Sequence, residues 1–560
     1  MMRNIRFVNL TFIIIIAFPL VVSAIGIDVP ATDPVYDFLK RLETRGVIKG
    51  FNDLTLPLTR DEIVNFLQIA SQKADELSAI EKKILHEFLA DYRYETERQL
   101  TEPDSISAPF YQKNYFRQAT ANLFSRQDAV EENHLLMYES GEAFFWFDVG
   151  ARGRMDWKEN HQKQMFSDRY LLRGALSKSL TFHTYFARFM KNGNPAFTEP
   201  YEEEIGNFSM VQPGGTVTFD ILQTSLVFHQ KYFNIGLYRQ PVAWGASGTN
   251  NLILSKSAPL FSYIGFDTKF KGIKLSMIHG SLLNDSTHYR DIAFQQRNRS
   301  KYIAAHRLDI PFFRGTTTVG FSEMVIYGDR EIDIAYMTPF GFYWPIGHAL
   351  EDRDNTLMAM DVKTTFIRNI TFYGSVLIDE MRFSELGKQW WANKHAWQAG
   401  MRWSPNIATL PFDFQAEFTA VRPWTYSHKT LTTNYTHNSI CLGFPYGANS
   451  QTWYFKIGTA LSRRLTLTSE YLILKKGVDD STHFWGGDAT VSYELRDEQY
   501  DHATKWLMGD IETTNQLKVA GRYEIFNDFF IKAGINLYNT KLNNDQESYR
   551  FGFIETEINF

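Results

Sequence analysis

The chain has 560 residues, of which 15% are aromatic and 22% charged, and its formal net charge is -5. The mean hydropathy of -0.29 is too low for a helical membrane protein, and the aromatic fraction is too high for a disordered chain. The one cysteine, Cys441, excludes a disulfide framework and a thiolate metal site. The acidic balance removes the electrostatic reason to expect a nucleic-acid partner.

Residues 1–24 have the pattern of a secretory signal peptide. Arg3 and Arg6 precede an apolar stretch that ends at Val22, and the small residue Ala24 follows at a plausible cleavage site. Pro19 interrupts this stretch, and no later one reaches the roughly 18 apolar residues of a membrane-spanning helix. We therefore expect an exported chain that would cross a membrane only with strands.

Residues 33 to about 100 have the apolar spacing and the capping residues of three short helices. Asp33 can cap a first helix that begins at Pro34. Two capping boxes, at residues 59–62 and 78–81, precede two further runs with helical apolar spacing. Because three short helices bury little area alone, we expect them to pack on a larger body.

From about Tyr115 to the end, apolar and polar residues alternate as they do in strands with one apolar face. Residues 453–461 and 516–525 show this pattern most clearly. In a soluble sandwich or propeller the apolar face would meet a core. In an outer-membrane barrel it would meet lipid, and the polar face would line the lumen. Alternation alone leaves both folds open.

The lengths of the connections favour the barrel. Very short turns are predicted at 271–272, 368–369, 463–464 and 527–528, and they alternate with long polar connections. Outer-membrane barrels have this asymmetry, with short periplasmic turns and long extracellular loops. The final aromatic residue, Phe560, resembles the C-terminal signal that barrel-insertion machinery reads. The long connections are predicted at 191–215, 284–300, 341–355, 381–395, 423–450 and 477–512.

The length from residue 115 to residue 560 sets the strand number. At about 25 residues for each strand and its connection, this stretch holds roughly 18 strands. The predicted fold is an all-β transmembrane barrel of about 18 antiparallel strands, with a small N-terminal α-helical domain plugging its periplasmic end. We expect a signal peptide at 1–24, a helical domain at 25–105 and the barrel at 106–560. The expected place is the outer membrane of a diderm, Gram-negative-type bacterium, with the barrel as a monomer.

Several short stretches of the chain, taken together and in order, resemble the capsule assembly Wzi family. They are residues 35–39, 45–46 and 57–60 in the helical part, then 239–245, 252–255 and 258–259, then 323–328 and 336–339, and finally 352–355, 357–358 and 361. The resemblance implies a barrel of about 18 strands closed on the periplasmic side by a helical bundle. It also implies a lectin-like protein that binds capsular or other surface polysaccharide and helps to attach or assemble it, without catalysis.

Sugar binding needs flat apolar faces for the pyranose rings and planar polar groups for their hydroxyls. Three long connections combine the two. For any single tryptophan the competing interpretation is a place in the aromatic girdle at the lipid interface. Trp390 and Trp391 fit a girdle least, because adjacent strand residues face opposite sides. The candidate carbohydrate-binding residues are Trp244, Trp344, Asp352, Arg353, Asp354, Asn355, Trp390, Trp391, Trp424 and Tyr426.

A porin or transporter channel is the main alternative function, because polar inner faces would suit it equally well. An enzyme has less support. His279, His288 and His306 lie near Ser and Asp residues, but no spacing ties them to a nucleophile, so we expect no catalytic residues.

The run from Asp352 to Asn355 begins like a calcium loop. Thr356 and Leu357, however, stand where a ligand and the required glycine should follow. We therefore expect no metal site and no cofactor. The expected partners are surface polysaccharide, outer-membrane lipid and the barrel-insertion machinery, with no nucleic acid.

Overall fold

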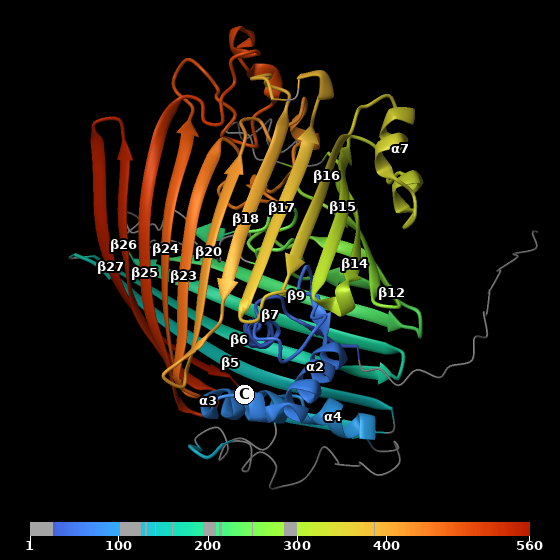
Figure 1. The fold of residues 1–560 in the computed structure, drawn as a ribbon, viewed down its shortest axis with the longest axis vertical. Helices are drawn as coiled ribbons and strands as arrows, with labels where there is room; N and C mark the ends of the chain where they lie inside the picture. Colours follow the sequence, from blue (N-terminus) through green and yellow to red (C-terminus); the bar gives the residue numbers. More distant parts are fainter. Residues whose placement is uncertain are drawn as a thin grey trace, which may run out of the picture.

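Eighteen antiparallel strands form a closed barrel in the computed structural model of the chain (Figure 1). The last strand, β27 (Asp545–Asn559), pairs with the first long strand, β5 (Ala143–Lys158), and so closes the wall. The predicted fold class and strand number are confirmed. The structure describes residues 26–100, 125–128, 132–140, 142–159, 161–193, 209–211, 216–248, 250–284, 299–385 and 387–559.

The strands of the wall follow one another in chain order. Between β5 and β27 they are β6 (His161–Ser177), β7 (Leu180–Gly193), β9 (Val217–His229), β10 (Phe233–Arg239), β12 (Ser262–Phe270), β13 (Ile273–Ser281), β14 (Lys301–Phe312), β15 (Thr317–Gly328), β16 (Asn355–Thr364), β17 (Ile370–Glu380), β18 (Lys394–Trp403), β20 (Leu410–Val421), β23 (Ser450–Ser462), β24 (Leu465–Val478), β25 (Asp510–Phe526) and β26 (Phe529–Leu542). Short strands at the ends of the wall or in connections are β4 (Leu136–Ser140), β8 (Ser209–Val211), β19 (Asn406–Ile407), β21 (Thr436–His437) and β22 (Ile440–Cys441).

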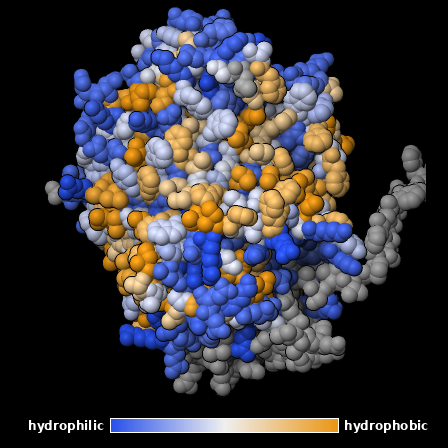
Figure 2. Space-filling model, viewed as in Figure 1, coloured by the Kyte–Doolittle hydropathy of each residue, from blue (hydrophilic) through white to orange (hydrophobic). Residues whose placement is uncertain are grey.

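The alternation in the sequence turns the apolar face of each strand outward. On β23, Trp453, Phe455 and Ile457 are 49%, 39% and 44% exposed, whereas Tyr454 between them is buried. Figure 2 shows apolar side chains spread over the middle of one face of the molecule, with hydrophilic side chains toward both ends. An apolar outer wall around a polar interior is the reverse of a soluble sandwich. None of the described helices is both long and apolar enough to cross a membrane.

The N-terminal helical region begins where the sequence predicts. The Asp33 carboxylate accepts a hydrogen bond from the Val35 amide at 2.9 Å, and both predicted capping boxes form. The helix that follows α3 was not predicted, because its sequence has few apolar residues to show a period. The helices are α1 (Pro34–Thr44), α2 (Arg60–Gln72), α3 (Ala79–Asp91) and α4 (Arg93–Leu100), with a 3₁₀ turn η1 (Ala74–Glu76).

The helical region packs against the end of the barrel where the turns are short (Figure 1). Arg41 of α1 helps to hold the helical region to the barrel. Its guanidinium is buried, and all three nitrogens donate hydrogen bonds. The acceptors are Glu81 Oε1 (2.8 Å), Phe412 O (2.6 Å), Asp413 Oδ1 (2.9 Å), Pro405 O (3.1 Å) and Asn406 Oδ1 (2.6 Å).

Short strands extend the contact between the helical region and the barrel. Within the region, β1 (Asp28–Val29) pairs with β3 (Leu58–Thr59). Then β2 (Thr55–Leu56) pairs with β11 (Ala243–Trp244), which belongs to the connection after β10. The backbone of the helical region is therefore bonded to a segment that folds into the barrel. The predicted boundary at residue 105 and the signal peptide lie outside the described residues.

A buried lysine on the wall also holds the helical region. Lys363 of β16 donates from Nζ to Glu43 Oε2 at 2.7 Å, to Asp53 Oδ1 at 2.5 Å and to the Phe51 carbonyl at 2.5 Å. Burial raises the pKa of the Glu43 carboxyl to about 7. Burial acts in the same direction on Asp53, but Lys363, Lys40 and other cations outweigh it and lower that pKa to about 2.

Replacing Glu43 with glutamine should make the attachment of the helical region less dependent on pH. A carboxyl whose pKa is raised by folding favours the folded state fully below its ordinary value of 4.5 and loses that contribution as the pH rises through about 7. Wild type and Glu43→Gln should release the region to protease equally near pH 4, whereas at pH 8 the wild type should release it more readily than the variant. A difference that stays constant with pH would contradict this account.

The two ends of the barrel carry different connections, as predicted. The turns at 271–272, 463–464 and 527–528 lie at the helical end, which we call the short-turn end. The predicted tight turn at 368–369 lies there too, but it is part of a longer connection, residues 365–369. The opposite, long-loop end carries the described long connections 240–261, 329–354, 381–393, 422–449 and 479–509.

Two features of the long-loop end differ from the prediction. The connection 240–261 is as long as its neighbours, although its apolar residues resemble a strand in the sequence. Conversely, two hairpins at this end are tight: β5 ends at Lys158 and β6 begins at His161, while β26 ends at Leu542 and β27 begins at Asp545. Because β27 pairs with β5, the two strand pairs are neighbours, but their hairpins lie at different heights. Trp157 near the end of β5 pairs with Gly552, so β27 and its partner β26 continue farther, through residues 545–551. We call this difference in height the rim step.

Connections from the long-loop end fill part of the lumen. Residues of 240–261 and 422–449 fold inward and form one apolar core with inward-facing wall residues such as Met324, Leu357 and Leu377. The wall alternates inward and outward residues, so this core accounts for the apolar residues at inward positions on β14 to β20. The loop residues of the core include Leu252, Ile253, Leu254, Tyr426, Tyr435 and Phe444.

Candidate functional site

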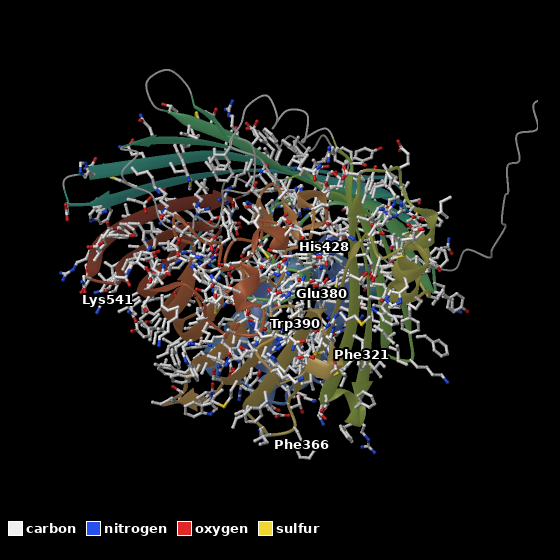
Figure 3. The ribbon with its side chains drawn as sticks, turned by 90° about the horizontal axis from the view of Figure 1, so that it is seen from above. Phe321, Phe366, Glu380, Trp390, His428 and Lys541 are labelled. Carbon is white, nitrogen blue, oxygen red and sulfur yellow. The ribbon has the colours of Figure 1, made fainter. Side chains whose placement is uncertain are left out.

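The long-loop end gathers most of the predicted site residues. Seen from above in Figure 3, Glu380, Trp390 and His428 lie close together over the interior of the barrel. Short 3₁₀ turns shape these connections: η4 (Ile334–Met337), η5 (Phe383–Glu385), η6 (Leu431–Thr433), η7 (Tyr493–Leu495) and η8 (Glu498–Tyr500). One helix, α7 (Tyr343–Ala349), lies in 329–354.

Trp391, Trp424 and Tyr493 form a buried aromatic cluster that joins three connections. The Arg496 guanidinium lies 3.9 Å from the centre of the Trp391 ring, and the Tyr493 ring lies 5.1 Å from it. The Trp391 amide donates to the Asp501 carbonyl at 2.8 Å. Aromatic and cation–π contacts of this kind hold loops in one arrangement at small entropic cost. We call Trp390, Trp391, Trp424 and Tyr493 the aromatic cluster.

Trp390 is the half-buried member of the aromatic cluster. The Arg382 guanidinium lies 5.4 Å from its ring centre, and the His502 ring lies 4.6 Å away. Phe383, beside Arg382, is 80% exposed. An apolar ring flanked by a guanidinium and an imidazole is the combination that stacks against a sugar and bonds its hydroxyls.

Asp354 and Asn355 point to opposite sides of the wall, as neighbours on a strand do. Asp354 accepts two hydrogen bonds from Arg330, each at 2.7 Å, and one from the Tyr336 hydroxyl at 2.9 Å. Asn355 donates to the Thr433 carbonyl at 3.0 Å inside the barrel. Both side chains are buried and hold connections in place, whereas Asp352 and Arg353 are exposed.

The other predicted residues are dispersed. Trp344 lies on α7 and is 49% exposed. Trp244 and Tyr426 are buried in the apolar core of the lumen, where the Tyr426 hydroxyl donates to the Leu252 carbonyl at 2.8 Å. The structure thus brings Trp390, Trp391 and Trp424 together, whereas Trp244 and Tyr426 pack into the apolar core of the lumen and Trp344 lies on α7.

Sequence reasoning missed two tryptophans of the connection 479–509. Trp506 lies 5.2 Å from the His395 ring, with the Arg422 guanidinium 5.7 Å from its centre. Trp485 donates from Nε1 to Asp480 Oδ2 at 2.9 Å and contacts the Tyr500 ring at 5.0 Å. The signal was present, since both are tryptophans in a long polar connection, but no motif singled them out.

A cavity of about 1170 Å³ lies between the inward-folded connections and the wall on the β23 to β25 side. We call it the loop-side cavity. Its lining combines Tyr446 and Tyr454 with polar and charged groups, and one wall position comes from Arg152 of β5. Its basic side chains are Arg152, Lys256, Lys456, Lys476 and Lys518, and its acidic ones are Glu470, Asp479 and Asp488.

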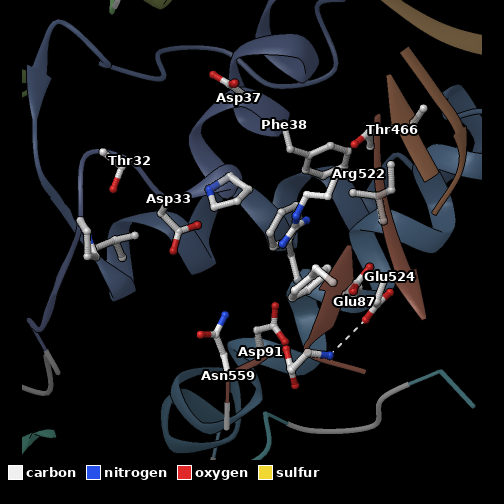
Figure 4. A pocket seen from close by; sticks show the side chains of 18 of the residues that line it. Thr32, Asp33, Asp37, Phe38, Glu87, Asp91, Thr466, Arg522, Glu524 and Asn559 are labelled. Carbon is white, nitrogen blue, oxygen red and sulfur yellow. Dashed lines mark hydrogen bonds between the residues drawn. The ribbon is translucent and has the colours of Figure 1, made fainter. Parts of the chain in front are cut away.

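A second cavity of about 990 Å³ separates the helical region from the wall. Figure 4 shows Asp33, Asp37 and Phe38 of the helical region lining it together with Thr466 and Arg522 of the strands. We call it the helix-side cavity. Thr32 and Lys456 line both cavities, so the two adjoin inside the half of the barrel that the apolar core leaves open.

The calcium-loop interpretation finds no support in the geometry of residues 352–355. Both carboxylate oxygens of Asp354 are engaged by Arg330, and Asn355 points into the barrel. Within the described part of the chain, no group of three or more His, Cys, Asp or Glu side chains is placed to hold a metal ion.

The chain resembles known proteins both in sequence and in fold. The family model for "Capsule assembly protein Wzi" matches residues 209–549. Among solved structures, Escherichia coli Wzi, described as an outer-membrane, carbohydrate-binding β-barrel involved in group 1 capsule assembly, has a TM-score of 0.57 and 12% identity. The alignment covers 95% of this chain and 99% of Wzi. At this identity the likeness concerns the fold.

Two further solved structures come from Pseudomonas aeruginosa. OprD has a TM-score of 0.41 and 9% identity, covering 74% of this chain and 95% of its own. OccK2 in complex with glucuronate has a TM-score of 0.43 and 9% identity, covering 74% and 98%. No curated protein matches the sequence. The match to the family model spans more than half of the residues, and the chain therefore belongs to the capsule assembly protein Wzi family.

Proposed function

We propose that this protein is an outer-membrane barrel that binds exported capsular or other surface polysaccharide and helps to attach or assemble it at the cell surface. In this proposal the long-loop end is extracellular, the helical domain of residues 25–105 plugs the periplasmic end, and the barrel of residues 106–560 works as a monomer. Family membership supports the proposal, as does the carbohydrate binding described for the Escherichia coli protein.

The aromatic cluster is the observation that carries the proposal. It places the half-buried Trp390 beside Arg382 and His502 on connections that the buried Trp391 and Trp424 hold together. A preorganised apolar face with planar donors loses little entropy when a sugar ring stacks on it. The loop-side cavity, which other residues of the connections 422–449 and 479–509 line, offers a second space for sugar units.

Deleting the gene tests the proposal directly. We expect cell-associated polysaccharide to fall and released polysaccharide to rise, with total synthesis unchanged, and the plasmid-borne gene should restore retention. The measurement is the ratio of pelleted to soluble polysaccharide after gentle washing. Unchanged retention would remove the capsule role.

A channel is the second candidate function, and the two adjoining cavities favour it. Together they leave a polar space between the loops and the helical region on one side of the lumen. Steady, large conductance of the intact protein in planar bilayers would support a pore. Closed or brief openings would support a binding protein whose lumen is plugged.

The proposed activity contains no chemical step. His279 bonds to the Tyr327 hydroxyl at 2.7 Å, and His306 Nε2 lies 3.1 Å from Glu323 Oε2. Tyr327 and Glu323 lie where the connection 329–354 covers the wall. The two histidines therefore help to hold that connection. His288 lies outside the described residues.

A further inference from the structure

The connection 329–354 has a composition unlike that of a loop in water. Between Asp333 and Glu351 it contains no Asp, Glu, Lys or Arg. Phe340 and Phe342 are 77% and 75% exposed. Exposed loops are ordinarily polar, and a large exposed apolar patch on a folded protein marks an interaction surface. The exposed apolar side chains are Ile332, Ile334, Met337, Phe340, Phe342 and Trp344.

This connection lies on the outside of the barrel, beside β15 and β16 (Figure 1). The register of the wall shows which side it covers. Phe321 faces outward and pairs with Met360, which is 45% exposed. Two positions farther along β15, Glu323 shares that outward face and pairs with Met358. α7 begins directly over Glu323, so it covers the outer face of the wall and leaves the mouth of the lumen free.

Polar contacts fix the connection to the wall. The carboxylate of Glu323 accepts hydrogen bonds from the amides of Tyr343 at 2.7 Å and Trp344 at 2.6 Å. The Tyr336 hydroxyl donates to Asp354 at 2.9 Å. Beneath these contacts, Tyr336 and Tyr343 are fully buried against Val325. The inner side of the connection therefore makes hydrogen bonds to the wall, and its outer side exposes aromatic side chains.

The aromatic outer side continues the apolar surface of the wall. Glu323 stands about 7 Å above Phe321 along β15, at 3.4 Å for each residue. The exposed rings of Phe340 and Phe342 thus lie at the upper edge of the apolar band that the outward-facing residues of the strands form. Aromatic rings at this level are typical of the boundary between acyl chains and headgroups.

We propose that residues 332–350 are an outer-leaflet anchor, whose exposed aromatic side chains insert among the lipids of the outer membrane at its extracellular face. The proposal rests on the membrane placement given under the proposed function. It assigns Trp344 to lipid instead of polysaccharide. The continuity with the apolar wall argues for lipid as the occupant, since a second copy of the chain or a glycan would not need that continuity.

Spin labels on the protein in lipid vesicles test this anchor. In a Cys441→Ser background, single labels are placed through Phe342→Cys on the anchor, Phe321→Cys on the wall and Ser481→Cys on an exposed polar connection. Collision with oxygen, which concentrates in lipid, is compared with collision with a water-soluble nickel chelate. We expect the label at 342 to resemble the one at 321, with oxygen favoured over nickel, and the label at 481 to show the reverse.

Each result has a distinct meaning. If the label at 342 behaves like that at 481, or is shielded from both reagents, the anchor proposal is overturned, because the rings then face water or protein. If the label at 321 is also accessible to nickel, the membrane placement itself fails. If the labels at 342 and 321 both favour oxygen and the label at 481 favours nickel, the anchor proposal is supported.

Discussion

Changing Arg41 to methionine should loosen the helical region from the barrel. The variant removes a buried guanidinium that donates to the Asp413 carboxylate and to the backbone carbonyls of Pro405 and Phe412 on the barrel. Glu81 stays paired with Arg45, so the expected loss is that of hydrogen bonds from a charged group, about 1.5–3 kcal/mol. We expect faster proteolysis of the helical region and larger conductance in planar bilayers.

Arg368→Met is the matched control for this prediction. Arg368 also pairs with the helical region, at 3.2 Å from Glu76, but both side chains are exposed. Exposed pairs contribute at most about 1 kcal/mol, so this variant should resemble the wild type. If the two variants behaved alike, the buried Arg41 contacts would not be what holds the region in place.

Changing Trp390 to alanine should weaken polysaccharide binding strongly. An aromatic side chain at the centre of a binding surface contributes about 2 kcal/mol or more, which corresponds to roughly thirtyfold in Kd. The barrel should keep its heat-modifiable mobility on gels, because Trp390 is only half-buried and lies beyond the wall. The measurement is binding of purified capsular polysaccharide to the detergent-solubilised protein.

Two further variants locate the effect. Trp453→Ala removes an outward tryptophan of the wall and should bind polysaccharide normally. Trp391→Ala leaves a cavity among buried side chains and lowers stability by about 3–5 kcal/mol. It should therefore loosen the connections as well as weaken binding. If Trp390→Ala alone and Trp390→Ala combined with Trp391→Ala both bind polysaccharide normally, the binding site is not at the aromatic cluster.

The fold was largely predictable because each of its determinants is local in sequence. Alternation sets the outward face of a strand, as Trp453 and Tyr454 show, and the caps at Asp33 and Thr59 set where helices begin. The length of the strand-forming part, at about 25 residues for each strand and its connection, then gives the strand number. The connection 240–261 escaped prediction because its apolar residues, which fill the lumen, have no period that distinguishes them from a strand.

The site was only partly predictable, since side-chain direction depends on contacts far apart in the sequence. Asp354 and Asn355 look like one polar motif, yet one holds the outer-wall connection through Arg330 and the other holds an inner loop. Trp244 looks like a stacking residue, yet β11 pairs with β2 of the helical region and buries it. Only the three-dimensional arrangement separates a tryptophan that can meet a ligand from one that packs a core.

The rim step has a consequence for how a long polymer would be held. Arg152 of β5 and Lys518 of β25 line the loop-side cavity on either side of β26 and β27, and these two strands stand above the neighbouring β5 to β6 hairpin. A polymer strand that leaves the space above the cavity over this lower hairpin passes out sideways, so neither of its ends has to be threaded. If polysaccharide occupies this space, the protein can capture and release a strand of any length.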